Sequence, residues 1–229
     1  IVAGINLVFL IPTNFSFDEK QHFIRAYNIA SFNINMDKTD PPLVWPDDIN
    51  QFLSFDGLEA SFDTIDEKDN YLEKFSETTN NIMETINSTA STYLPIAYIP
   101  AALGIALGKL CHLPFVGIYY LGRLFNALTY SLIVFWALKG LKYGQRLMST
   151  LGLVPAVLFL TGTYSADPMT LAFAFAAVSV FIKMLTAPDH TVGWKPVALF
   201  TLFCALVCTC KMTYAPLILL LFAVGREKF

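Results

Sequence analysis

Long apolar segments in the second half of the chain constrain its fold more than any other feature. Hydrophobic residues make up 55% of the 229 residues and charged residues 14%, against about 45–50% and 25% in soluble domains. Because about 20 apolar residues cross a bilayer as a helix, we predict an all-α polytopic membrane protein. This composition argues against a soluble enzyme, a disordered chain and a nucleic-acid-binding protein. The expected spans in the bundle 116–229 are 116–138, 147–163, 169–185, 197–210 and 214–224.

We expect both ends of this chain to be cut ends of a longer sequence. Residues 1–11 are apolar but too short to cross a bilayer, so we expect them to be the end of a first transmembrane helix. Residues 225–229 are polar and basic, as at the start of a cytoplasmic loop. We therefore expect an N-terminal portion of a longer protein, whose bundle continues beyond this chain.

Residues 12–115 form a long polar and acidic stretch between the apolar parts. From Pro12 to Pro95 there are fifteen acidic and five basic residues, a net charge of −10, and the remainder has three and ten, or +7, which together give −3. The connection 139–146 carries three bases and no acid, which predicts a cytoplasmic position. Counting outwards, we expect an integral protein of the plasma membrane with a large first extracytoplasmic loop.

Two helical patterns and one broken apolar segment organise this loop. Phe23, Ala26, Tyr27 and Ala30 recur at helical spacing, which predicts a juxtamembrane helix that lies on a membrane surface or packs on the bundle. Prolines and glycines interrupt the apolar segment 93–113, which predicts an interfacial or re-entrant segment, with a full span as the alternative. A weaker helical stripe is formed by Leu72, Phe75, Ile82, Met83 and Ile86.

The predicted topology places six ionisable residues at one level, near the outer ends of the spans. A mixed cluster of charges at one level suggests a cavity. Structural alternatives remain for each residue: capping by the acids, snorkelling by the lysine, an Arg123–Asp167 ion pair, and a structural histidine. The six residues are Asp18, Glu19, His22, Arg123, Asp167 and Lys211.

The charges of these six residues predict phosphate binding and general-base catalysis. Cations near the outer interface can hold a lipid-linked phosphate or diphosphate, with arginine giving bidentate contacts and lysine a point charge. A carboxylate that faces them can take a proton from an acceptor hydroxyl as a general base.

Five motifs, in this order and spacing, resemble domain-of-unknown-function family 2142, a group of polytopic membrane proteins. The first is FDEKQHF at 17–23, which follows the first span. The others are YLPIAYIPA at 93–101, GRLFN at 122–126, YSAD at 164–167 and KMTYAP at 211–216.

That family is similar in layout to the GT-C-fold glycosyltransferases, which have a large first outer loop and use polyprenyl-phosphate sugars. The resemblance implies sugar transfer to a glycan or other acceptor on the outer face, with membrane lipids around the bundle, and it leaves the metal requirement open, including a divalent cation. It implies Asp18 as the catalytic base with Glu19 as its neighbour or substitute. Arg123 and Lys211 would bind the donor phosphate, and the supporting residues would be His22, Asp167 and Tyr214.

Two other functions stay open on the sequence. One is a transporter or flippase for a lipid-linked or anionic solute, which predicts polar residues that continue to the membrane midplane. The other is a non-catalytic membrane scaffold whose acidic loop binds a partner or cations. The loop has no calcium-loop spacing, and the four cysteines have no metal-ligand spacing.

Overall fold

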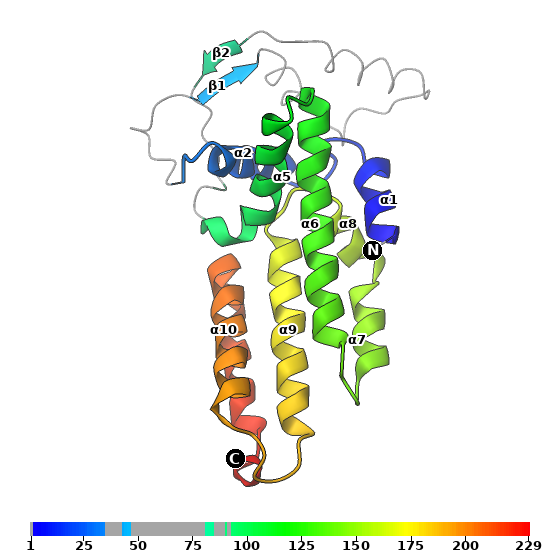
Figure 1. The fold of residues 1–229 in the computed structure, drawn as a ribbon, viewed down its shortest axis with the longest axis vertical. Coiled ribbons are helices and arrows are strands. Elements are labelled where there is room, and N and C mark those ends of the chain that lie inside the picture. The colour runs from blue at the N-terminus through cyan, green and yellow to red at the C-terminus, as the bar shows by residue number, and fades with distance from the viewer. Residues whose placement is uncertain (1, 35–42, 47–80, 85–89, 91–92) are drawn as a thin grey trace.

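The computed structural model describes residues 2–34, 43–46, 81–84, 90 and 93–229, and this part is helical apart from two short strands (Figure 1). The predicted helical class is therefore confirmed in outline. The elements are α1 (Val2–Leu10), α2 (Glu19–Ala30), β1 (Leu43–Pro46), β2 (Asn81–Glu84), η2 (Pro95–Tyr98), α5 (Ile99–Leu110), α6 (Phe115–Leu138), α7 (Gln145–Gly152), α8 (Pro155–Thr161), α9 (Asp167–Leu185), α10 (Trp194–Cys210), η3 (Met212–Ala223) and η4 (Arg226–Lys228).

Among the described residues, two helices are long and apolar enough to cross a membrane. These are α6, with 24 residues, and α9, with 19 residues. The apolar segment Pro95–Leu110, α10 and η3 are shorter. Figure 1 shows α6, α9 and α10 running along the length of the molecule, and α6 packs on α5 and α9 while α9 packs on α10. These helices position the candidate site residues that were predicted from the sequence.

The segment 147–163, expected as one span, folds as two short helices. Its N-terminal part belongs to α7, which ends at Gly152, and α8 begins at Pro155. Proline lacks a backbone N–H and disfavours helical geometry in the residue before it. Val154 accordingly has an extended backbone at ψ 133°. Neither helix reaches the length of about 20 residues that a full span needs.

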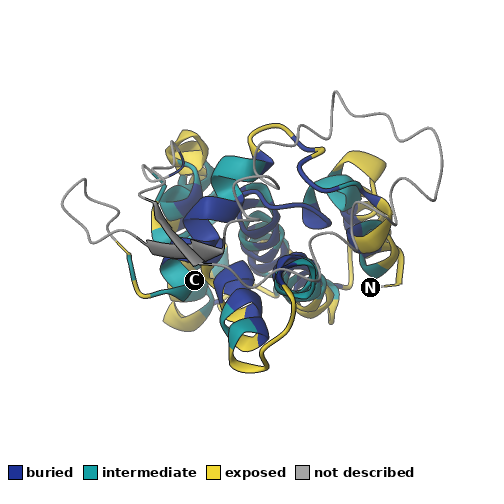
Figure 2. Cartoon of the chain, turned by 90° about the horizontal axis from the view of Figure 1, so that it is seen from above, coloured by how far each residue is buried: buried dark blue, intermediate teal, exposed yellow. Residues whose placement is uncertain are grey.

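Helix α2 lies across one end of the bundle (Figure 1) and buries one face on it. The helix predicted from Phe23, Ala26 and Tyr27 is confirmed, since all three side chains are buried. The ring of Phe23 packs against the rings of Tyr119 in α6 and Tyr164, with ring centroids 5.1 Å apart in both pairs. Seen from that end, the buried residues gather in the middle of the bundle (Figure 2).

A short antiparallel strand pair, which we did not predict, lies beyond α2. Leu43 of β1 is opposite Glu84 of β2, and Pro46 is opposite Asn81. Residues 82 and 83, expected in a helical stripe, therefore lie in a strand, whereas residues 72, 75 and 86 of that stripe lie outside the described residues. A short apolar run fits a strand as well as a helix, and pairing with β1 decides between them.

Arg25 ties α2 to two distant points of the chain. Its Nη1 donates to the carbonyl oxygen of Ile34 at 2.7 Å, and its Nη2 donates to that of Tyr93 at 3.1 Å. The side chain is buried, so these hydrogen bonds are made away from water. Arg25 thus fixes α2 against the segment that leads into η2.

Candidate functional site

Helices α9 and α10 bring an ion pair to the end of the bundle that α2 covers. Asp167 is the first residue of α9, and Lys211 directly follows α10. Because the two helices pack side by side in opposite directions, the start of one meets the end of the other. The Lys211 ammonium pairs with the Asp167 carboxylate, and their side chains are 32% and 27% exposed. This pair is open to solvent and to a ligand.

Ser165 orients the carboxylate of Asp167. Its hydroxyl donates to Asp167 Oδ2 at 3.2 Å and accepts the backbone N–H of Asp167 at 3.1 Å. Asp167 was a candidate N-cap of the following helix, but the N-cap position is taken by Ala166. The carboxylate is therefore directed to Lys211.

The His22 imidazole lies within the field of the same charged residues. Burial lowers its pKa, the negative charges of Asp167 and Asp18 raise it, and Lys211 lowers it, so that the pKa of His22 lies below its usual 6.5. His22 Nδ1 is 2.7 Å from the Tyr98 hydroxyl, and the two rings stack with centroids 5.7 Å apart. This contact and the ring stacking hold the His22 imidazole in place against Tyr98.

Asp18 is the exposed carboxylate of this group. Its backbone is left-handed at φ 56°, a conformation that aspartate adopts more readily than most residues. Asp18 is the N-cap of α2, and its side chain makes no capping hydrogen bond. The carboxylate thus stands at the solvent-exposed start of α2, one helical turn before His22.

Tyr214 extends the group on the side of Lys211. Its backbone N–H donates to the carbonyl oxygen of Lys211 at 3.2 Å, and its side chain is 43% exposed. The hydrogen bond and charge of Asp167, with smaller contributions from Tyr93 and Tyr214, outweigh the burial that lowers the pKa of Lys211 and raise that pKa overall. We name Asp18, His22, Asp167, Lys211 and Tyr214 the outer cluster.

Glu19 and Arg123 form a second ion pair, which is closed to solvent. Arg123 Nη2 is 2.7 Å from Glu19 Oε1, and both side chains are 0% exposed. Arg123 Nε also donates to Glu19 Oε1 at 2.8 Å. We name this pair the buried clamp.

The clamp satisfies every N–H of the Arg123 guanidinium. Nη1 donates to the carbonyl oxygens of Val8 at 3.3 Å and Ile11 at 2.8 Å, and Nη2 donates to that of Pro12 at 2.9 Å. These carbonyls lie at and just beyond the C-terminal end of α1, where helix carbonyls lack partners and favour a positive charge. Arg123 therefore caps α1 from within α6.

Glu19 joins the clamp to α2 and to the segment before α9. Its Oε1 accepts the backbone N–H of Tyr164 at 2.9 Å, and its Oε2 accepts that of Ser16 at 3.3 Å. A carboxylate in the first turn of a helix is favoured by the helix dipole. One carboxylate thus fixes the segments that carry Asp18 and Asp167.

The structure therefore separates the six residues expected at one level into two groups. Asp18, His22, Asp167 and Lys211 come together, whereas Glu19 and Arg123 pair behind them. The Arg123–Asp167 pair considered from the sequence does not form, because Arg123 pairs with Glu19 and Asp167 with Lys211. Ser165 and Tyr98 were not predicted as site residues, although both lie within the YSAD and YLPIAYIPA motifs.

No metal centre is found in the part of the chain that the structure describes: no group of three or more His, Cys, Asp or Glu side chains there could hold a metal ion. The four cysteines are free thiols.

Comparison with known protein families gives a match over the whole chain. A family model described as "Predicted membrane protein (DUF2142)" matches residues 1–229. No curated protein and no solved structure matches the chain. The resemblance carried by the five motifs is confirmed, and it extends over the whole sequence.

Proposed function

The chain belongs to the DUF2142 family of predicted membrane proteins, and we propose that it is a glycosyltransferase acting at the outer face of the membrane. It would move a sugar from a polyprenyl-phosphate donor to a hydroxyl of a glycan or other acceptor. The observation that carries this proposal is the outer cluster, where an exposed carboxylate, a partly exposed cation and an imidazole with a lowered pKa meet at one end of an apolar bundle.

Asp18 is the general base in this proposal. Its carboxylate takes the proton of the acceptor hydroxyl, whose oxygen then bonds to the anomeric carbon of the donor sugar. The bond from that carbon to the phosphate oxygen breaks, and polyprenyl phosphate leaves, so the anomeric carbon is inverted. An exposed carboxylate that does not cap its helix is free to approach an acceptor.

Lys211 binds the donor phosphate in this proposal. An ammonium that is about one-third exposed can contact a phosphate and keep part of its contact with Asp167. Asp167, oriented by Ser165, is then a positioning residue for Lys211. Tyr214 and His22 are the supporting residues of this proposed site.

Glu19 and Arg123 take a structural part, in place of the catalytic and phosphate-binding roles that the resemblance implied. Both are closed to solvent, and Arg123 has a partner for each N–H, so a donor phosphate would have to displace buried hydrogen bonds. The clamp instead positions the turn that carries Asp18.

The test is transfer by the full chain in proteoliposomes, with a panel of radiolabelled polyprenyl-phosphate sugars as donors and a membrane glycan extract as acceptor. Asp18→Asn should lower the transfer rate by about 10²–10⁴-fold, the usual contribution of a general base. The matched control is Asp189→Asn, since Asp189 is an exposed aspartate in the connection between α9 and α10. Full transfer by Asp18→Asn would contradict the proposal.

Transport is the alternative function, and the two candidate spans give it little support. Arg123 is the only Lys, Arg, Asp or Glu in α6, and those of α9 are Asp167 and Lys183, close to its two ends. A charged path through the middle of these helices is therefore missing. Uptake of labelled donor into vesicles without transfer would favour transport.

A further inference from the structure

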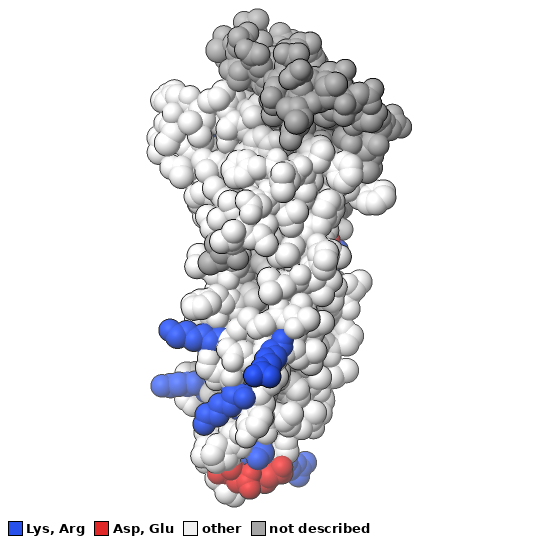
Figure 3. Space-filling view, turned by 90° about the vertical axis from the view of Figure 1, so that its right-hand side faces the viewer, with Lys and Arg blue, Asp and Glu red and all other residues white. Residues whose placement is uncertain are grey.

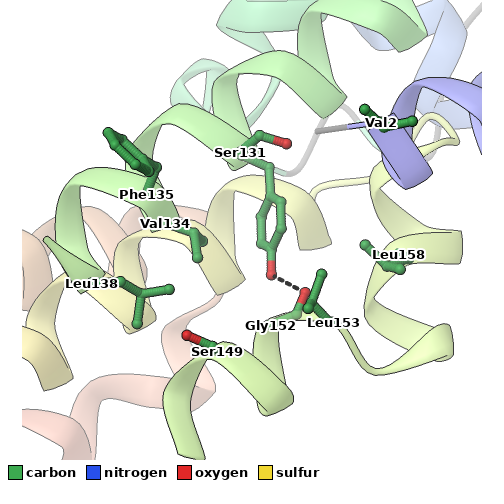
Figure 4. A pocket seen from close by; sticks show the side chains of 10 residues that line it. Val2, Ser131, Val134, Phe135, Leu138, Ser149, Gly152, Leu153 and Leu158 are labelled. Atoms are coloured by element: carbon green, nitrogen blue, oxygen red, sulfur yellow. Dashed lines mark hydrogen bonds between the residues drawn. The ribbon is translucent and has the colours of Figure 1, made fainter. Parts of the chain in front are cut away.

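An apolar pocket opens between the start of α1, α6, α7 and α8, and none of its lining residues belongs to the outer cluster (Figure 4). Its volume is about 410 Å³, and its wall includes Val134, Leu138, Leu153 and Leu158. The hydroxyl of Tyr130, which also lines the pocket, is engaged by the carbonyl oxygen of Gly152 at 3.1 Å. The volume lies within the range of about 300–1,000 Å³ that is usual for ligand pockets.

The pocket exists because the helix breaks between α7 and α8. Two short helices joined at Leu153 and Val154 do not cover the side of α6 as one straight helix would. Gly152 widens the space further, since a Cβ there would make only ordinary contacts, the nearest 3.5 Å away on Tyr130 and Val134. The cavity therefore follows from the proline and glycine positions.

Three basic residues stand at one end of this pocket. Lys139 directly follows Leu138, a lining residue, and Lys142 lies in the same turn. Arg146 lies three residues before Ser149, another lining residue, and hence on the same face of α7. All three bases are exposed, and within the described residues none of them has a carboxylate partner.

A fourth base reinforces this turn. Lys183 of α9 donates from Nζ to the carbonyl oxygen of Lys139 at 3.2 Å. Figure 3 shows Lys and Arg side chains gathered on the lower part of this face, with a group of acidic side chains below them, while the described surface above is almost free of charge. The nearby acid Asp189 is engaged by Lys228 at 2.8 Å. The turn 139–146 therefore presents uncompensated positive charge.

We propose that the pocket and this basic turn together bind one anionic phospholipid. One acyl chain fills the apolar pocket, and the phosphate lies at Lys139, Lys142 and Arg146. The two features match the two parts of such a lipid, since the apolar wall suits the chain and the unpaired cations suit the headgroup. This site does not depend on the proposed transferase activity, which uses the other end of the bundle.

The experiment measures lipid binding to the purified full chain in detergent by native mass spectrometry and by the shift in Tm. The probes are dioleoyl-phosphatidylglycerol, dioleoyl-phosphatidylcholine and inorganic phosphate. We expect phosphatidylglycerol to bind and to raise Tm, and the other two to do so weakly or not at all. Equal effects of the two lipids, or an equal effect of phosphate alone, would overturn the proposal.

Two variants test the two halves of the site. Lys142→Gln/Arg146→Gln should weaken phosphatidylglycerol binding by roughly thirtyfold, from about 1 kcal/mol for each basic residue near an anionic lipid. The control Lys195→Gln/Arg226→Gln removes the same charge from other exposed positions and should bind as the parent does. Equal losses in both double variants would show a general charge effect and would overturn the site.

Ser149→Leu tests the pocket, because a larger side chain there occupies the space of the acyl chain. It should lower phosphatidylglycerol binding while all basic residues remain. A Tm of the lipid-free variant equal to or above that of the parent shows that the fold is kept. Unchanged binding by this variant, or a pocket occupied by another segment of a longer form of the protein, would refute the acyl-chain position.

Discussion

The two ion pairs of this protein use the same types of group and differ in their exposure to water. Glu19–Arg123 is closed to solvent, whereas Asp167–Lys211 is about one-third open. In the buried clamp, backbone groups of α1 and of the segment before α9 satisfy the remaining hydrogen-bonding positions. In the exposed pair, Ser165 supports the carboxylate, and the ammonium remains accessible. Burial, and not charge alone, thus separates a residue that holds the fold from one that can meet a ligand.

The largest effect should come from breaking the buried clamp. Arg123→Met leaves a buried carboxylate without its partner, and Glu19→Gln leaves a buried guanidinium, each at a cost of about 3–5 kcal/mol in the free energy of unfolding. Denaturant unfolding in detergent micelles measures this cost. The control Glu227→Gln changes an exposed glutamate and should be nearly neutral.

The double variant Glu19→Gln/Arg123→Met should regain part of that loss, because no unpaired charge then remains buried. If each single variant lowered the free energy of unfolding by less than about 1 kcal/mol, the buried clamp would contribute no more than an exposed ion pair does. The contrast between the two pairs would then be lost.

The next effect should come from the packing beside the clamp. A Cβ at Gly122 would collide with the Tyr164 hydroxyl, which donates to the carbonyl oxygen of Tyr119 at 2.7 Å. Gly122→Ala should therefore lower stability by about 1–3 kcal/mol, the usual cost of overpacking. At Gly193, where nothing lies within 4 Å of an added Cβ, the change to Ala should have little effect. Equal stabilities of the two variants would show that Tyr164 moves aside freely.

A smaller effect on stability should follow from breaking the exposed pair. Lys211→Gln should cost less than about 1 kcal/mol, because solvent screens a partly exposed pair. If the proposed transferase activity is correct, the same change should raise KM for the polyprenyl-phosphate donor. Unfolding and transfer assays on one preparation separate the two effects. A stability loss as large as that of Arg123→Met would make Lys211 a structural residue.

The smallest effect concerns the pH dependence of stability through His22. Burial holds its pKa below 6.5 in the folded protein, so the unfolded chain binds the proton more readily. The contribution of neutral His22 is fully present above about pH 6.5 and is lost as the pH falls below that value. The charges of Asp18 and Asp167 offset part of the burial effect, which keeps the change small. Unfolding measured from about pH 8 to about pH 5 in His22→Gln should lack this decline.

Asp167→Asn refines this comparison, because it removes a negative charge that raises the pKa of His22. The pKa should fall further, and NMR titration of the imidazole measures it. Asp189→Asn, which changes an aspartate that does not act on His22, should leave the pKa unchanged. Equal shifts in both variants would show that His22 does not sense the outer cluster.

Sequence patterns predicted the helical class and α2 well. Apolar length identifies α6 and α9, and helical spacing identifies α2, because both signals are local. The broken span at 147–163 and the β1–β2 pair were missed. In the first case, Pro155 ends the helical geometry at Val154 although the whole segment is apolar. In the second case, the partner strand is distant in sequence.

By itself, the sequence determined that the chain has long apolar helices and that several ionisable residues stand near the ends of its apolar segments. Only the tertiary structure decided which of those residues pair. Glu19 and its neighbour Asp18 are alike in sequence, but α1, α6 and Tyr164 enclose Glu19 and leave Asp18 exposed. Burial depends on segments more than 100 residues apart, as in the bond of Arg123 to Glu19. No local sequence pattern encodes such a contact. The free-energy cost of desolvating a buried charge is offset only where distant backbone groups converge on that charge.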